Sequence, residues 1–170
     1  MKKICFIVIF VLITMSCFSQ NDGRNDEFYI EIDNKRFYLR YSTRSDVEAF
    51  LGPPSIVTHY ERGGEGFNWN DFIYCFYDNE NISFHYNDEG YIIRITIYST
   101  QNNRISLPYG HLNTITFNII EPIARQTDPT GRFIRQSAIT IWKGNFNPII
   151  FSFNDDLILR WVDASYDSPW

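Results

Sequence analysis

Residues able to carry out catalysis are few in this chain. It holds three histidines, His59, His85 and His111, and three cysteines. His59 and Glu61 alone are too few ligands for a zinc site, which needs three or four. The motifs HExxH, CxxC and GxSxG are missing from the sequence, and Gly63-Gly64-Glu65-Gly66 lacks the Lys-Ser/Thr of a phosphate-binding loop. We therefore predict no catalytic residues, no metal and no cofactor, and interpret residues 63–66 as a hairpin tip.

Cys75 and His85 are the strongest candidates for a nucleophile and its base, because strand periodicity places both on one face of a predicted sheet. No basic residues surround Cys75 in the sequence, and a lone cysteine is usually a small apolar core residue. Asn87-Asp88-Glu89-Gly90 and Asn154-Asp155-Asp156 lack calcium-loop spacing and are typical of turns. We expect a protein that is not an enzyme.

Composition predicts one folded domain. The chain has 170 residues, of which 44% are hydrophobic and 18% aromatic, which excludes a disordered chain. Three cysteines are too few for a disulfide scaffold. The net charge of -5 excludes the basic footprint of a nucleic-acid-binding protein. The sequence therefore predicts no nucleic-acid partner.

The first 19 residues have the order of a secretory signal peptide. Met1-Lys2-Lys3 precedes an apolar run over residues 4–15, which is too short to span a membrane, and small and polar residues follow. The pattern predicts export to the periplasm or outer envelope. Loss of Lys2 and Lys3 would change the net charge from -5 to -7.

Two processing routes stay open. Cys17-Phe18-Ser19 fits cleavage before Gln20, which would release a soluble chain. Thr14-Met15-Ser16-Cys17 resembles a bacterial lipobox, although leucine is usual at the position of Thr14. In that case Cys17 would carry a lipid, and the membrane would be reached only through this anchor.

The remaining sequence predicts a polar tether over residues 20–27 and one α+β domain over 28–166. A β-hairpin, 28–32 with 36–41, comes first. A helix follows over 43–51, because Thr43 or Ser45 can cap it and Gly52-Pro53-Pro54 ends it. Strands at 56–60, 71–77, 82–86 and 91–98 then form an antiparallel meander, with a linker after Ser99. We expect short helices on one face of this sheet.

Residues 111–162 look like a second copy of the plan in 42–98, giving two tandem helix-plus-sheet repeats. Phe84, Asn87 and Arg94 would correspond to Phe151, Asn154 and Arg160. Pro122 disturbs the matching helix unless it lies in the first turn. Chance similarity of two apolar hairpins is the alternative.

Period-two alternation divides the predicted strands into a core face and an outer face. The expected core residues are Tyr74, Phe76, Ile82, Phe84, Tyr86, Ile93, Ile95, Ile97, Ile139, Ile141, Phe151, Phe153, Leu157, Leu159 and Trp161. The outer face would carry Cys75, Tyr77, Ser83, His85, Arg94, Thr96, Tyr98, Thr140, Trp142, Ser152 and Arg160.

Two segments together carry a family resemblance: Thr43-x-x-Asp46-Val47-x-x-x-Leu51-Gly52-x-Pro54 and Phe84-x-Tyr86-Asn87-Asp88-x-Gly90-x-Ile92. They resemble the small exported modules of the SmpA/OmlA (BamE-like) type and the related β-lactamase-inhibitor-protein-like repeat. The resemblance covers 42–98 well and 111–162 poorly. It implies a lipoprotein or periplasmic protein with a protein-binding role. The segment 67–70 and the N-terminal hairpin depart from that pattern.

Two classes of function follow. The first is a non-catalytic envelope module that binds or assembles with a protein. Its expected surface comprises Tyr77, His85, Arg94, Trp142 and Arg160. Tyrosine, tryptophan and arginine are enriched at binding hot spots. An alternative surface is the aromatic loop with His59, Tyr60, Phe67 and Trp69. The second class is a secreted enzyme inhibitor or a small hydrolase-like enzyme.

Overall fold

The computed structural model describes residues 28–61, 71–135, 137–143 and 147–166. The predicted signal peptide with Cys17, the tether over 20–27, and Phe67 and Trp69 of the aromatic loop lie outside the described residues. The same holds for the predicted hairpin tip at 63–66. Among the described residues, no helix is long and apolar enough to cross a membrane.

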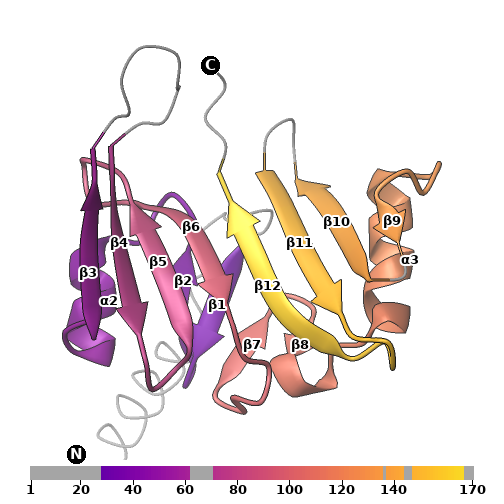
Figure 1. Cartoon of the computed structure of the whole chain (residues 1–170), viewed down its shortest axis with the longest axis horizontal. Helices are drawn as coiled ribbons and strands as arrows, with labels where there is room; N and C mark the ends of the chain where they lie inside the picture. Colours follow the sequence, from indigo (N-terminus) through magenta and orange to yellow (C-terminus); the bar gives the residue numbers. More distant parts are fainter. Residues whose placement is uncertain (1–27, 62–70, 136, 144–146, 167–170) are drawn as a thin grey trace, which may run out of the picture.

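Two antiparallel sheets make up most of the fold (Figure 1). The smaller sheet has the strand order β2-β1-β7-β8, and its strands are β1 (Tyr29–Ile32), β2 (Lys35–Tyr38), β7 (Ile105–Leu107) and β8 (Gly110–His111). The larger sheet has the order β3-β4-β5-β6-β12-β11-β10-β9, and its strands are β3 (Ile56–Tyr60), β4 (Phe72–Tyr77), β5 (Ile82–Tyr86), β6 (Ile92–Ile97), β9 (Ile134–Arg135), β10 (Ala138–Lys143), β11 (Asn147–Phe153) and β12 (Leu159–Ser165).

The larger sheet consists of two four-stranded halves joined where β6 pairs with β12. Each half is preceded in the chain by one helix, α2 (Arg44–Leu51) before β3 and α3 (Phe117–Thr127) before β9. A short 3-10 helix, η1 (Leu112–Thr114), connects β8 to the second half. The two predicted repeats, 42–98 and 111–162, overlap these halves. That the two segments are repeats of one sequence stays a prediction.

Local sequence determines how the two helices begin and end. Thr43 caps α2: its side chain accepts a hydrogen bond from the backbone N–H of Asp46, and Asp46 accepts one from the backbone N–H of Thr43. Gly52 ends the helix with a φ of 82°. In α3, Pro122 lies beyond the first turn, where a proline is expected to disturb the helix. Proline has no N–H to donate to the carbonyl one turn earlier, yet the helix continues to Thr127 because Ile120 and Ala124 are buried.

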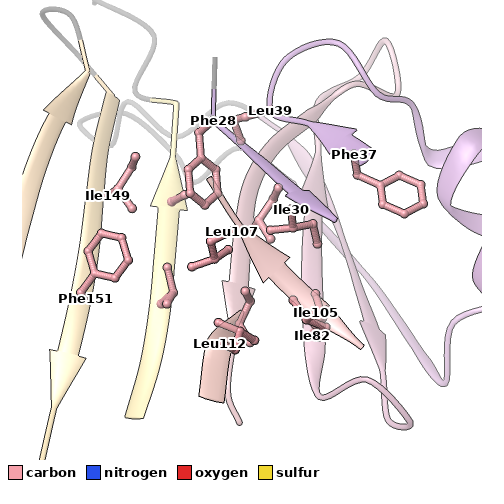
Figure 2. Close-up of a cluster of buried hydrophobic side chains, with 14 of the residues drawn as sticks. Phe28, Ile30, Phe37, Leu39, Ile82, Ile105, Leu107, Leu112, Ile149 and Phe151 are labelled. Carbon is pink, nitrogen blue, oxygen red and sulfur yellow. The ribbon is translucent and has the colours of Figure 1, made fainter. Parts of the chain in front are cut away.

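The core lies between the two sheets. Ile30 and Ile32 of β1 and Ile105 of β7 are fully buried, as are Ile82 and Phe151 of the larger sheet. Figure 2 shows Ile30, Ile82 and Ile105 among the side chains gathered between the strands of the two layers. The Phe37 ring contacts Phe84 with centroids 6.2 Å apart, which links the smaller sheet directly to β5. One apolar core therefore holds the layers together.

The predicted α+β class, with helices on one face of a single meander, is wrong. The structure is mostly β, with two sheets and only two α-helices among the described residues. The segment after Ser99, expected to be a linker, contains β7 and β8. Strand β7 pairs with the N-terminal hairpin, because Glu31 and Ile32 lie opposite Ser106 and Ile105, and β8 pairs with β7. The layer that covers the larger sheet's core face is therefore largely a second sheet.

The predicted faces of β4 are wrong, because the structure has them reversed. Cys75 pairs with Phe84, and Tyr77 pairs with Ile82, so Cys75 and Tyr77 point into the core. Tyr74 and Phe76 consequently lie on the opposite face. The sequence of β4 is apolar or aromatic at every position, so alternation alone could not choose between the faces.

Irregular pairing explains the other differences. A register shift between His85 and Tyr86 leaves Ile93 as the extra residue of β6, and Ile93 is only partly buried. A second shift, between Ser152 and Phe153, leaves Arg160 as the extra residue of β12. Trp161 therefore pairs with Ser152 on the face away from the core.

Candidate binding groove on the open sheet face

The larger sheet has one face without a covering layer among the described elements. In Figure 1 this face is turned toward the reader, and the smaller sheet lies behind it. We call it the open face. Its side chains are the alternate residues of each strand, such as Tyr74 opposite His85 and Thr96 opposite Asp163. An antiparallel sheet can leave one face to solvent, but that face is then usually polar.

The open face is hollowed into a groove of about 520 Å³. Strands β3, β4, β5, β6 and β12 supply its walls and floor, together with the residue that follows β6. The lining residues are Tyr60, Phe72, Tyr74, His85, Arg94, Thr96, Tyr98, Trp161 and Asp163. Five of these nine side chains are Phe, Tyr or Trp, so the groove presents mainly ring surface.

Three rings form a stacked row along one side of the groove. Tyr60 and Phe72 lie directly opposite each other on β3 and β4, with ring centroids 4.6 Å apart and planes 19° apart. Phe72 stacks on His85 at 5.0 Å and 15°. Tyr74 meets the His85 ring edge-on, at 5.2 Å and 85°. Such arrangements stabilise aromatic pairs beyond their buried area and hold the exposed rings in fixed positions.

An ion pair lies on the groove floor. The Arg94 guanidinium donates from Nε to Oδ1 of Asp163 at 2.8 Å and from Nη2 to Oδ2 at 2.7 Å. The Thr96 hydroxyl donates to the same Oδ1 at 2.9 Å. The Asp163 side chain is 7% exposed and that of Arg94 is 43% exposed. The carboxylate therefore lies buried in the groove floor, and the guanidinium paired with it reaches solvent. Two parallel hydrogen bonds of this kind fix the guanidinium plane.

The groove carries no net charge near neutral pH. Arg94 and Asp163 offset each other. Burial, together with the positive charge of Arg94, lowers the pKa of His85 to about 4, so its imidazole is neutral. Burial raises the pKa of Tyr74 to about 12, so its phenol keeps its proton. The groove therefore contrasts with a chain whose overall charge is -5.

The structure brings together only part of the predicted binding surface. His85 and Arg94 line the groove. Tyr77 is 3% exposed and packs edge-on against Phe84 in the core, so its predicted role at the surface is wrong. Trp142 lies on β10 beside Phe133, outside the groove lining. Arg160 is exposed at the bulge of β12 and does not line the groove.

The structure also places only part of the alternative aromatic loop at the groove. Tyr60 lines the groove and is 49% exposed. His59 lies one residue away on β3, opposite Ile73, so it occupies the other face of the strand. The predicted pairing of Arg94 and Arg160 on one surface is also not seen. Arg94 lines the groove, where it forms an ion pair with Asp163, whereas Arg160 does not line it.

The sequence pattern placed Tyr98 on the outer face, where it lines the groove, but it did not identify Phe72, Tyr74 and Trp161 as ring surface or Asp163 as the partner of Arg94. One signal was present for Asp163, because a single acidic residue in Leu-Arg-Trp-Val-Asp-Ala-Ser needs a partner if that strand is buried. The aromatic residues gave no such signal, since they occur at positions of both phases in β4.

The described residues do not assemble the proposed nucleophile and base. Cys75 is fully buried on the core face of β4, whereas His85 faces the groove on the other side of the sheet. Burial raises the pKa of the Cys75 thiol, which disfavours the reactive thiolate. Among the described residues, no group of three or more His, Cys, Asp and Glu side chains could hold a metal ion.

Comparisons with known proteins add little information about this groove. No family model matches the chain, and no curated protein matches it. Among solved structures, the chain is similar to a DUF4309 family protein (YjgB) from Bacillus subtilis subsp. subtilis str. 168, at 18% sequence identity and a TM-score of 0.39. That similarity covers 76% of this chain and 81% of the Bacillus chain.

Proposed function

We propose that this chain is an exported, non-catalytic protein of the cell envelope that binds a protein partner on its open face. The observation that carries the proposal is the neutral, ring-lined groove on a sheet face left uncovered by the described elements. Large exposed apolar patches are uncommon on monomeric proteins and mark interaction sites. Export is supported by the signal-peptide pattern over residues 1–19.

The dimensions of the groove favour a macromolecular partner. Its lining extends over five neighbouring strands, from β3 to β12, which corresponds to about 19 Å across the sheet. The groove is open to solvent along this width and does not enclose a ligand. Tyrosine, tryptophan and arginine together form the usual energetic centre of a protein interface. The resemblance of residues 42–98 to exported protein-binding modules points the same way.

Charge further restricts the partner. A charged side chain entering the groove would be desolvated against rings, and Arg94, the one cation among the described lining residues, is already paired with Asp163. We therefore propose that the contacting surface of the partner is apolar and uncharged. An enzyme could supply such a surface, so an inhibitory role is one form of this function. A hydrolase-like activity has less support, because Cys75 and His85 lie on opposite faces.

Site-specific photo-crosslinking tests the proposal. A photoreactive phenylalanine analogue replaces Tyr98, which lines the groove and is 49% exposed. The matched control replaces Tyr91, which is 38% exposed and lies outside the groove. We expect irradiation of intact cells to give a discrete protein adduct from position 98 and none from position 91. Equal adducts at both positions, or none at position 98, would contradict the proposal.

A further inference from the structure

The sheet edges differ sharply in how they are protected. Edge strands expose backbone N–H and C=O groups, and proteins usually block them with charged residues, proline or very short strands. Strand β2 carries Lys35 and Arg36, both exposed. Strands β8 and β9 have two residues each. Each of these three edges therefore has a recognisable block against pairing with another chain.

Strand β3 is the exception among the sheet edges of the described residues. It spans Ile56–Tyr60, pairs with β4 along its whole length without a register shift, and contains no Lys, Arg, Asp, Glu or Pro. Ile56 is 50% exposed, Val57 41% and Tyr60 49%. Of the described elements, β4 is the one with which β3 makes extensive contact. Its free side therefore presents a regular, uncharged and apolar strand.

The sequence of β3 is also complementary to itself. When two copies pair antiparallel about a two-fold axis through Thr58, Ile56 lies opposite Tyr60 of the second copy, and Thr58 lies opposite Thr58. Pairs of an aromatic with a β-branched residue, and of two threonines, stabilise antiparallel strands. Val57 lies opposite His59 of the second copy on the other face. The register places no like charges opposite each other and gives the closed, isologous contact typical of homodimers.

We infer that β3 is a homodimerisation edge, at which two copies of this chain pair to form one continuous sheet. A two-fold axis perpendicular to the sheet keeps both open faces on the same side. Ile56, Thr58 and Tyr60 lie on that side, because they pair with Phe76, Tyr74 and Phe72. Ile56 of the second copy then lies against Tyr60 and lengthens the groove wall, so the two grooves meet at the junction. The dimer does not depend on what the groove binds.

Sedimentation velocity of the purified protein measures the dimer directly. Five residues from each copy make a small contact, so we expect the dimer fraction to rise over about 1 to 100 μM protein. The substitution Thr58→Lys places two like charges directly opposite each other and is expected to raise the dissociation constant about tenfold or more. Thr140→Lys is the control, since Thr140 is also a partly buried threonine of the open face.

A cysteine variant tests the register and keeps the test valid if lysine harms folding. Thr58→Cys brings two thiols together at the axis, where cross-strand Cβ atoms lie about 4.5 to 5.5 Å apart. We expect an intermolecular disulfide that reductant reverses, and none from Thr140→Cys. The native Cys75 is fully buried and does not compete. A wild-type chain that stays monomeric throughout, or a Thr58→Lys chain that dimerises as well as wild type, would overturn the inference.

Discussion

Replacing Asp163 by asparagine keeps the shape of the side chain but removes its charge from the groove floor. The carboxylate accepts two hydrogen bonds from Arg94 and one from Thr96. A hydrogen bond to a charged group contributes about 1.5 to 3 kcal/mol when its partner is buried. Asparagine retains part of this network, and the Arg94 side chain is 43% exposed, so water can solvate its charge. We therefore expect a loss of about 2 kcal/mol in the free energy of unfolding.

Urea denaturation followed by circular dichroism measures this loss, and thermal unfolding should show a melting temperature lower by about 4 to 8 °C. Asp155→Asn is the control, because Asp155 is exposed in a turn and should change stability by less than about 0.5 kcal/mol. A double-mutant cycle with Arg94→Gln should give a coupling energy of about 1 kcal/mol. A loss below about 0.5 kcal/mol for Asp163→Asn, or full additivity in the cycle, would refute the role given to this pair.

Three further predictions concern the core, the response to pH and the N-terminus. In urea denaturation, Phe84→Ala should lower the free energy of unfolding by about 3–5 kcal/mol, because Phe84 is fully buried. Ser83→Ala should lower it by about 1 kcal/mol, because the hydrogen bond with Tyr98 is lost. Equal losses would contradict the assigned faces. The pKa of His85 is lowered from 6.5 to about 4, so as the pH falls the unfolded state takes up a proton before the folded state does. The free energy of unfolding should therefore fall by about 3 kcal/mol as the pH drops from 6.5 to about 4. His85→Phe should remove most of that fall, and an unchanged pH profile would show that His85 is not buried as a neutral ring. Intact-mass spectrometry of the native protein should show cleavage between Ser16 and Gln20, with a diacylglyceryl mass if Cys17 is the first residue; a retained N-terminal segment would contradict export.

Local signals in the sequence predicted individual elements well. The helix at Arg44–Leu51 lies within the predicted range, because Thr43 is one of the two candidate caps and Gly52 marks a clear end. The alternation of Ile82, Phe84 and Tyr86 with Ser83 and His85 likewise identified the core face of β5. In both cases the information lies in residues close together in the chain.

Features that depend on long-range pairing were not predicted. Strands β7 and β8 have three and two residues, too few to show a period, and only the pairing of β7 with β1 and of β8 with β7 makes them strands. The phase of β4 is decided by its pairing with β5, and that of β12 by the bulge at Arg160. The ion pair of Arg94 and Asp163 joins residues 69 positions apart, so local sequence patterns could not predict it.

Binding of the partner by the open face is tested most directly by a dissociation constant. It is measured for the protein identified by crosslinking from position 98, with wild type and with the double variant Tyr98→Ala and Trp161→Ala. Both side chains line the groove, and removing two aromatic side chains at an interface centre should weaken binding about tenfold or more. Tyr91→Ala, outside the groove, should bind as wild type does. An unchanged dissociation constant for a correctly folded double variant would contradict the claim.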